Sequence, residues 1–423
     1  MDLKSQILDF GRRARAAARA LSRLGTSKKN AALRAMADEI VARTEPILLA
    51  NEKDLAAARV NSLASAMIDR LTLNTSRIEK MAEGVREVAA LPDPVGEIIR
   101  EWTQPNGIRI SKVRVPIGVI GIIYESRPNV TSDAAVLCTK TGNATILRGG
   151  SESIHSNVAI AEALQAGCAK AGLPADSILL IPQTDREAVR YMAEMDRYID
   201  LIIPRGGHAL IEAVVSHARM PVIKHSQGIC IVYVDKEADL VMASDIIVDA
   251  KTQRPGVCNA IETVLVHRDI ALSLFERLAP RLAEKKVELR ADEKAFLQLS
   301  ELNYHPLLQA SEADWTTEFL DFILAVRIVD GPTAAIEHIE RNGSHHSDCI
   351  VTRDEPTAEQ FLREVDSATV YWNASTRFTD GGEFGFGVEI GISTDKLHAR
   401  GPMALEELTT YKYKLRGTGQ VRG

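Results

Sequence analysis

The chain has 423 residues, of which 45% are hydrophobic, enough to bury the cores of more than one domain. Its 57 acidic and 51 basic residues give a formal net charge of -6 without long runs of one sign, which argues against nucleic acid as a partner. No apolar stretch approaches the roughly 20 residues that cross a bilayer, and the five cysteines are an odd number without Cys-x-x-Cys spacing. We therefore expect a globular protein of a reducing compartment, the cytoplasm, with no membrane partner.

The first hundred residues are predicted to be helical. Apolar residues recur at intervals of three and four from Leu3 to about Leu91, the pattern of amphipathic helices. Prolines then break the pattern. Asn106-Gly107 follows between two strand-like runs, which predicts a β-hairpin.

Strands and helices alternate after the hairpin. The first strand is predicted in the apolar run 115–124, which is typical of a strand buried on both faces of a parallel sheet. The series continues with predicted strands at 144–147, 178–181, 201–203 and 229–234 and helices at 157–171 and 186–195. Such alternation predicts an α/β domain with right-handed crossovers.

A second alternating series begins near Asp239. It comprises a helix through 250, a strand at 261–266, a helix at 270–285 and strands at 322–329 and 349–351. The tail 408–415 alternates with period two, which suits an edge strand joining the hairpin. The predicted fold class is α/β, with two doubly wound domains and a small β element.

One cysteine stands out by its context. Cys258 follows the turn signal Pro255-Gly256 and precedes a buried strand, a position that exposes the sulfur at the end of an element. Nearby cations, Lys251 and Arg254, would favour its thiolate form. By residue type alone, an inert buried cysteine is the commoner interpretation.

Five segments in order along the chain bear on that choice. They are 116–131 (PIGVIGIIYESRPNVT), 140–152, 204–207 (PRGG), 254–258 (RPGVC) and 384–394. Together they resemble the aldehyde dehydrogenase superfamily and, within it, the enzymes that reduce L-glutamyl 5-phosphate to glutamate 5-semialdehyde in proline biosynthesis. The resemblance implies a cofactor-binding domain, a catalytic domain and an oligomerisation β element. These would be 1–100 with 116–230, 231–380, and 101–115 with 400–423.

The resemblance also implies a mechanism. Cys258 attacks the acyl carbon, phosphate leaves, and the resulting thioester accepts hydride from NADPH. The side-chain amide of Asn129 and the backbone N–H of Cys258 would hold the oxyanion. Without the resemblance, Asn129 is more simply a turn asparagine after proline.

The chain departs from the hydrolytic members of the superfamily at 222–228. Those members carry a general-base glutamate in a Glu-Leu-Gly-Gly segment, whereas this chain reads VIKHSQG. Without that base, water has no obvious activator, which favours acyl transfer to phosphate over hydrolysis. His225 is either an assisting group or a structural histidine.

Cofactor contacts also follow from the resemblance. Arg148, with Gly149 beside it, would lie near the adenosine ribose, and its charge would suit the 2′-phosphate of NADP. Glu318 would hold the nicotinamide ribose. On residue type alone, a surface ion pair for Arg148 and a solvated helix face for Glu318 are equally good interpretations.

The substrate brings a carboxylate, an amine and a phosphate, so the resemblance implies contacts from polar residues. The candidates are Glu125, Ser126, Arg127 and His346. The run His345–Asp348 resembles a set of metal ligands, but adjacent histidines on an extended segment point to opposite faces, so we expect no metal.

Alternatives remain open at this point. The chain could be another acyl-phosphate or acyl-CoA reductase of the superfamily, or a non-catalytic scaffold with the same fold. We expect a homo-oligomer, and the lability of glutamyl phosphate makes transient contact with glutamate 5-kinase a hypothesis.

Overall fold

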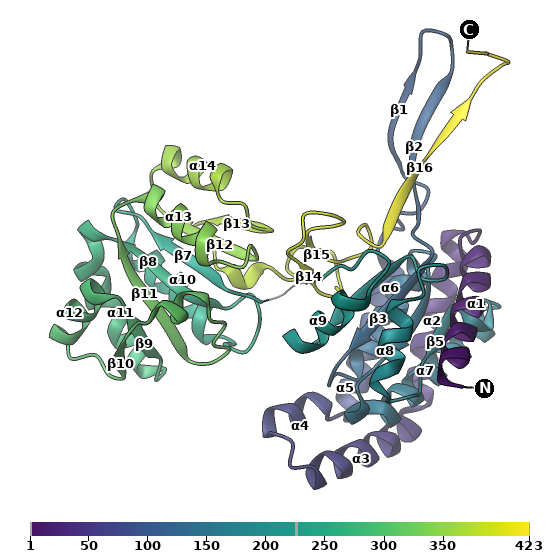
Figure 1. The fold of residues 1–423 in the computed structure, drawn as a ribbon, viewed down its shortest axis with the longest axis horizontal. Coiled ribbons are helices and arrows are strands. Elements are labelled where there is room, and N and C mark those ends of the chain that lie inside the picture. Colours follow the sequence, from purple (N-terminus) through teal and green to yellow (C-terminus); the bar gives the residue numbers. More distant parts are fainter. Residues whose placement is uncertain (1, 225–226, 423) are drawn as a thin grey trace. The chain divides into compact units, whose positions relative to one another are not determined.

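The structure is a computed structural model that describes residues 2–224 and 227–422. The chain forms two compact units (Figure 1). Unit 1 comprises Met1–Lys224, Gly385–Gly391 and Met403–Gly423, and unit 2 comprises His225–Phe384 and Ile392–Pro402. In the described part of the chain, none of the helices combines the length and apolar character that a membrane crossing requires.

Unit 1 begins with the predicted layer of helices. They are α1 (Leu3–Leu21), α2 (Thr26–Ala42), α3 (Thr44–Val60), α4 (Ser65–Leu71) and α5 (Thr75–Ala90). Side chains cap two of them, because Asp2 accepts from the backbone of Ser5 and Asn74 from that of Arg77. The buried face of α2 packs against α5, α6 and α7.

A four-stranded parallel sheet, in the order β5-β4-β3-β6, forms the rest of the body of unit 1. The strands are β3 (Val119–Tyr124), β4 (Ala144–Arg148), β5 (Ile178–Leu180) and β6 (Leu201–Arg205), and the helices are α6 (Asn129–Lys140), α7 (Ile154–Lys170), α8 (Arg186–Ala193) and α9 (His208–His217). The chain runs outward from β3 to β5 and then returns to the other side of β3. The strand order therefore switches between β3 and β6, and ligands of such sheets bind outside the carboxyl ends at this point.

The predicted single strand at 115–124 is two strands. The first, β2 (Arg109–Pro116), belongs to a separate sheet, and β3 begins only at Val119. Gly118 lies between them with φ 136, a conformation that L-residues rarely adopt, and its N–H donates to Asn143 Oδ1 at 2.8 Å. The sequence prediction missed this break between strands because the run is apolar, and only its proline and glycine indicate the break locally.

Unit 2 contains a seven-stranded sheet, in the order β10-β9-β11-β8-β7-β12-β13, whose pairs are all parallel. Its strands are β7 (Cys230–Val234), β8 (Ile261–His267), β9 (Glu288–Ala291), β10 (Leu307–Gln309), β11 (Ile323–Val329), β12 (Ser347–Val351) and β13 (Thr369–Trp372). Its helices are α10 (Leu240–Thr252), α11 (Ala271–Glu284), α12 (Glu293–Glu301), α13 (Pro332–Asn342) and α14 (Glu355–Glu364). Alternate residues of β7 enter two cores, Val232 with α10 and α11 and Ile231 with α13 and α14. The sheet is therefore covered on both faces, as predicted for a doubly wound domain.

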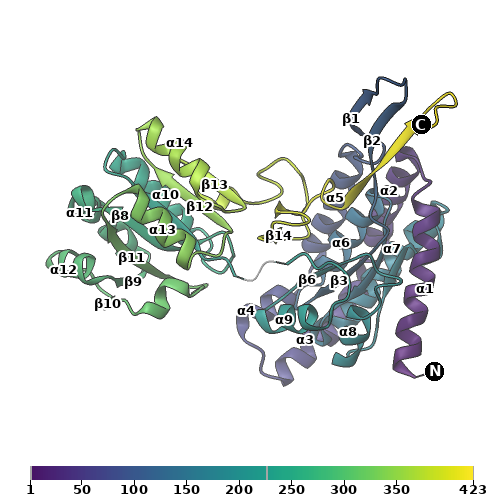
Figure 2. The ribbon, with the colours of Figure 1, turned by 45° about the horizontal axis from the view of Figure 1, so that its top comes forward.

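A three-stranded antiparallel arm projects from unit 1 (Figures 1 and 2). Its order is β1 (Ile98–Thr103), β2, β16 (Thr409–Arg416). Gly107, with φ 86, makes the predicted turn, and its N–H donates to the Gln104 carbonyl at 2.8 Å. The C-terminal strand pairs with β2 along its whole length, which confirms the prediction for the tail.

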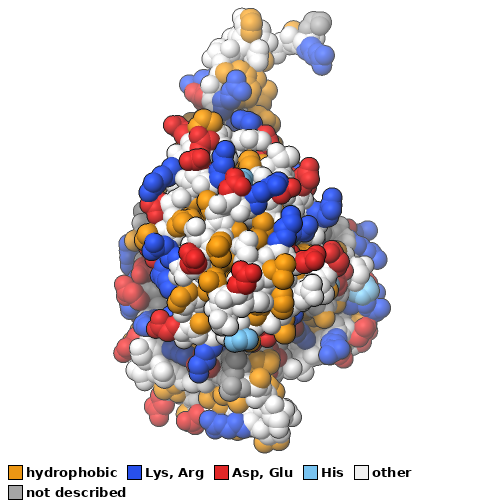
Figure 3. Space-filling model, turned by 90° about the vertical axis from the view of Figure 1, so that its left-hand side faces the viewer, with side chains coloured by type: hydrophobic (Ala, Val, Ile, Leu, Met, Phe, Trp, Pro, Cys, Tyr) orange, Lys and Arg blue, Asp and Glu red, His pale blue; other side chains and the backbone are white. Residues whose placement is uncertain are grey.

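A separate two-stranded antiparallel ribbon consists of β14 (Ile392–Ser393) and β15 (Gly401–Pro402). On the face in Figure 3, acidic and basic side chains are interspersed.

Candidate active site

The candidate nucleophile lies in a turn between α10 and β8. Cys258 is partly exposed, whereas Cys138, Cys168, Cys230 and Cys349 are buried. Burial raises the pKa of the Cys138, Cys168 and Cys349 thiols to about 12, so these three are poor nucleophiles. Exposure therefore distinguishes Cys258 from the other cysteines.

The backbone of the cysteine turn is held by close packing. A Cβ added at Gly228 would lie 2.0 Å from the carbonyl oxygen of Cys258 and 2.5 Å from its Cα. Only glycine permits this approach. The thiol of Cys230, the first residue of β7, donates to the same carbonyl oxygen at 3.2 Å.

His346 lies behind the turn. Its side chain is fully buried, and its Nδ1 is 3.6 Å from Cys230 Sγ and 2.9 Å from Ser347 Oγ. The imidazole thus touches the cysteine that supports the Cys258 carbonyl. This placement suits a residue that orients the turn.

A second set of hydrogen bonds holds Asn259, the residue after Cys258. Asn259 Nδ2 donates to the carbonyl of Thr379 at 2.9 Å, and Thr376 Oγ1 donates to the carbonyl of Asn259 at 2.7 Å. Thr379 Oγ1 is also 2.6 Å from Ser347 Oγ, so the hydrogen bonds around Asn259 and those around His346 join in one buried network. Sequence analysis missed this network because its threonines lie more than 100 residues from the cysteine and carry no local motif.

Lys251 does not serve the cysteine as predicted. Its ammonium is fully buried and bonds Glu262 Oε2 at 2.6 Å and the carbonyl of Ile261 at 3.0 Å. Burial lowers the pKa of Lys251 and raises that of Glu262 to about 7. The lysine charge is therefore balanced by its own partner, and of the two cations predicted, Arg254 is the exposed one.

Glu318 lies in the same unit as Cys258. Its Oε1 accepts from the N–H of Gly228 at 2.9 Å, and burial raises the pKa of its carboxyl group. Gly228 thus contacts both Glu318 and the cysteine turn. His225, in the same segment, lies outside the described residues.

The other candidate residues follow β3, at the switch point of the unit 1 sheet. Glu125 Oε2 accepts from the N–H of Gly207 at 2.9 Å, which joins the ends of β3 and β6. Ser126 donates to Glu152 Oε1 through its N–H and its hydroxyl, at 2.6 and 2.8 Å. Arg127 follows directly and is partly exposed.

Asn129 opens α6 and is exposed. Its Nδ2 donates to Asp133 Oδ2 at 2.8 Å. A primary amide has two N–H donors, so one remains available to a ligand. Burial raises the pKa of Asp133 to about 6.

Arg148, at the carboxyl end of β4, is a candidate contact for the dinucleotide cofactor. Its side chain is 7% exposed, and one Nη donates to the carbonyl of Thr184 at 2.9 Å. Its Nε has no hydrogen-bond partner in the described part of the chain. The next residue, Gly149, approaches Asn157 so closely that a Cβ would lie 2.1 Å from its Nδ2. The charge of an arginine at the carboxyl end of a parallel strand, beside a glycine, suits a phosphorylated ribose.

The residues of the His345–Asp348 run face apart. His345 Nδ1 is 2.9 Å from the carbonyl of Asp366, whereas Asp348 accepts from the N–H of Ile231 and the hydroxyl of Ser367. Across residues 2–224 and 227–422, no group of three His, Cys, Asp or Glu side chains has an arrangement that could hold a metal ion.

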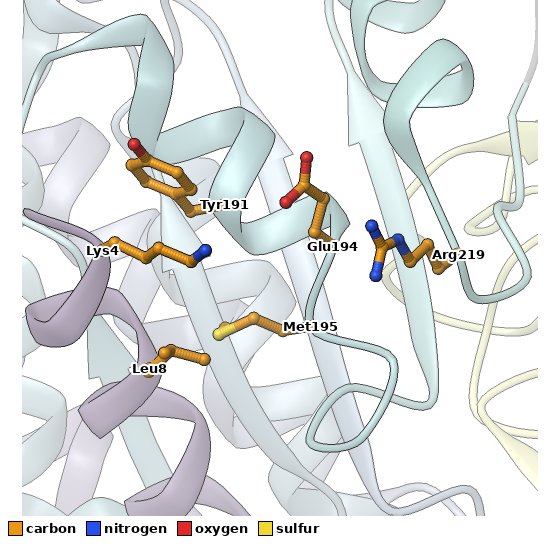
Figure 4. Close-up of a pocket in the computed structure, with 6 residues that line it drawn as sticks. All are labelled: Lys4, Leu8, Tyr191, Glu194, Met195 and Arg219. Carbon is orange, nitrogen blue, oxygen red and sulfur yellow. The ribbon is translucent and has the colours of Figure 1, made fainter.

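Unit 1 also has a small cavity of about 170 Å³ between α1 and α8 (Figure 4). Its lining consists of Lys4, Leu8, Tyr191, Glu194, Met195 and Arg219. None of these is a candidate site residue. The cavity is too small for a dinucleotide, because ligand pockets for much smaller drug-sized molecules measure roughly 300 to 1,000 Å³.

Comparisons with known proteins agree with the fold and the motifs. The model of the aldehyde dehydrogenase family matches residues 4–321. A γ-glutamyl phosphate reductase of Moorella thermoacetica is 55% identical over 424 residues, covering 100% of both chains. The crystal structure of a γ-glutamyl phosphate reductase from Thermotoga maritima superposes with a TM-score of 0.96 at 44% identity, over 99% of this chain and 100% of that one. An acetylating aldehyde dehydrogenase from Geobacillus thermoglucosidasius, 19% identical with a TM-score of 0.71 over 100% of this chain and 98% of its own, shares the fold.

Proposed function

The chain belongs to the aldehyde dehydrogenase family, and we propose that it reduces L-glutamyl 5-phosphate to L-glutamate 5-semialdehyde and phosphate with NADPH, in proline biosynthesis. The observation that carries the proposal is the end-to-end similarity, above 50% identity, to relatives named γ-glutamyl phosphate reductase. A shared fold alone would not specify the substrate.

Cys258 is the proposed nucleophile. Its sulfur forms a bond to the acyl carbon, and the C–O bond to phosphate then breaks, which leaves a thioester and free phosphate. The amide of Asn129 and the backbone N–H of Cys258 stabilise the oxyanion of the tetrahedral intermediate. Loss of one such donor typically lowers the rate by about 10²- to 10³-fold.

Aldehyde dehydrogenases use a nicotinamide cofactor, and NADPH would supply the hydride here. Arg148 and Gly149 would hold its adenosine ribose and 2′-phosphate, and Glu318 its nicotinamide ribose. The positive charge of Arg148 and its place at the carboxyl end of β4 support this assignment. Arginine suits a phosphate because its planar fork donates two parallel hydrogen bonds.

For the substrate, Glu125, Ser126 and Arg127 remain the proposed contacts. Glu125 and Arg127 offer opposite charges for the α-amine and α-carboxylate. His346 was predicted as a further contact, but because its side chain is fully buried, we propose that it acts through Cys230 on the cysteine turn.

The cellular setting is part of the proposal. We place the reaction in the cytoplasm, with the arm of β1, β2 and β16 joining copies of the chain into a homo-oligomer. The acyl phosphate is labile, so direct transfer from glutamate 5-kinase would protect it from water. Recovery of the kinase after cross-linking would support that contact.

The test runs the reaction in reverse. Semialdehyde, NADP and phosphate are supplied to the native chain, to Cys258→Ala and to a control, Cys168→Ala, which removes a buried thiol on α7. We expect phosphate-dependent NADPH formation that disappears only in Cys258→Ala. Equal rates without phosphate would favour hydrolysis, and a requirement for coenzyme A in place of phosphate would favour an acyl-CoA reductase. Activity surviving in Cys258→Ala would remove that thiol from the mechanism.

A further inference from the structure

Two arginines flank the cysteine turn. Arg254 is exposed and opens the segment that leads to Cys258. Arg377 lies on the short 3-10 helix Thr376–Phe378, and its Nε donates to Gln253 Oε1 at 2.8 Å. The backbone carbonyl of Arg377 accepts from Asn259 Nδ2 at 3.3 Å. Arg377 therefore bonds residues on both sides of Cys258 in the sequence.

Neither arginine forms an ion pair with a carboxylate in the part of the chain that the structure describes. Across the described residues, no Asp or Glu oxygen lies within 4 Å of either guanidinium in an ion pair, although 14 other arginines make such pairs. The charge of Arg377 interacts more distantly with Asp249 and Asp380 and with Arg254 and Cys258. Asp380 uses its Oδ1 to accept from the N–H of Gly382 at 2.8 Å.

This arrangement is costly without an anion. Burial lowers the pKa of Arg377 because it disfavours the charged form, and the attraction of Asp249 and Asp380 offsets this effect only in part. The like charge of Arg254 adds repulsion. An anion bound by both guanidinium groups would remove both penalties, and Lys251 cannot substitute because Glu262 already balances its charge.

We infer that Arg254 and Arg377 form the subsite for the phosphoryl group of the acyl phosphate. The inference rests on the proposed function, because in an acyl phosphate the phosphate is bonded to the acyl carbon that Cys258 attacks. The phosphate must therefore lie next to the cysteine turn in both directions of the reaction. Guanidinium groups match phosphate oxygens bidentately and stabilise the charge of the leaving group.

The test compares Arg377→Met, Arg254→Met and the double variant with the native chain in the reverse reaction. We expect the KM for phosphate to rise roughly 10- to 100-fold per arginine, because a hydrogen bond to a charged group contributes about 1.5 to 3 kcal/mol. The KM values for NADP and semialdehyde should stay within a factor of two. Arg377→Lys should give an intermediate KM for phosphate, since lysine keeps the charge and loses the fork.

The matched control is Arg363→Met. Arg363 lies on α14 of the same unit and is 70% exposed, so its loss should leave all three KM values unchanged. A rise in the KM for NADP or for semialdehyde, with that for phosphate unchanged, would assign the arginines to another anionic group and overturn the inference.

A second measurement is independent of turnover. Iodoacetamide alkylation of Cys258, followed by mass spectrometry, should be slowed by inorganic phosphate in the native chain and unaffected by it in the double variant. If phosphate protects Cys258 in a chain that lacks phosphate-dependent NADP reduction, the subsite stands and the proposed function falls. If the native chain is active and phosphate gives the same protection in the double variant, the subsite falls and the function stands.

Discussion

Residues at the cysteine turn differ in how well the local sequence predicts their positions and contacts. Cys258 could be singled out because a Pro-Gly turn and an apolar strand bracket it locally, and its role as nucleophile was inferred from the resemblance of five segments to a known family. Asn259 and Thr379 could not, since their hydrogen bond joins positions 120 residues apart. Lys251 was misassigned for a related reason. Its charge was apparent in the sequence, but its partner Glu262 lies across a turn on another element.

Gly228 gives a prediction at this scale. In Gly228→Ala the new Cβ would meet backbone atoms of Cys258 at 2.0 to 2.6 Å, and backbone cannot yield as a flexible side chain can. The turn must therefore move, and a displacement of about 1 Å at a reacting group can lower the rate roughly 100-fold. We expect kcat of the phosphate-dependent reaction to fall by about that factor.

The control for this substitution is Gly331→Ala in the same unit. Gly331 has φ 161, which is extended backbone, and nothing lies within 4 Å of an added Cβ. Its kcat should match that of the native chain. Native kcat in Gly228→Ala, in a chain with unchanged thermal unfolding, would show that the close contact does not position the nucleophile.

At the scale of elements, long patterned segments were predicted better than short ones. The helical layer and the strands at the centre of both sheets have clear periodicity. The strands β9, β10 and β13 were missed, since they have three or four residues and are only partly buried. Such segments are strands because a neighbouring edge pairs with them, and their own sequence carries little signal.

Asp348 links two elements and makes stability depend on pH. Its Oδ1 accepts from the N–H of Ile231, which ties β12 to β7, and Ser367 Oγ donates to its Oδ2 at 2.5 Å. Burial raises the pKa of Asp348 from 3.8 to about 7. Between these values the folded chain holds a proton that the unfolded chain has released, so the free energy of unfolding falls as pH rises through this window.

The substitution Asp348→Asn should remove this dependence. The amide keeps an acceptor for Ile231 and cannot ionise, so the variant should lose less stability between pH 4.5 and pH 8. The difference should amount to roughly 1 to 4 kcal/mol in urea unfolding. Asp330→Asn, which changes an exposed side chain, should keep the native slope. Parallel curves for native and Asp348→Asn chains would contradict the argument.

For the whole molecule, the two units present their candidate residues at opposite ends of their sheets. In unit 1, Glu125 follows β3 and Arg148 ends β4, both at the carboxyl ends where the general rule for doubly wound sheets predicts ligands. In unit 2, Cys258 and His346 precede β8 and β12, at the amino ends. At the carboxyl end of β7, Asp235 accepts from Tyr233 and Thr352, which are not candidate site residues. The fold rule therefore locates the candidate residues of unit 1, and only the motif locates those of unit 2.

The arm was predicted from its turn and its alternation, and it leads to a prediction about assembly. Tyr411, Tyr413 and Leu415 share one face of β16 and are 49%, 53% and 62% exposed. Trp102 on β1 packs edge-on against Tyr413 at 6.2 Å between ring centroids, which extends this aromatic face across the sheet. An exposed aromatic face beside free strand edges is typical of a surface that another chain covers.

We therefore expect Tyr411→Ser with Tyr413→Ser to dissociate the proposed homo-oligomer, because the substitutions remove apolar area that would be buried between copies. Light scattering after size exclusion would measure the mass of the native chain and of the variant. Lys412→Ser with Lys414→Ser changes the opposite face of the same strand and should leave the mass unchanged. If the tyrosine variant kept the native mass while the lysine variant dissociated, the other face of the arm would be the interface, and a monomeric native chain would remove the arm's proposed role altogether.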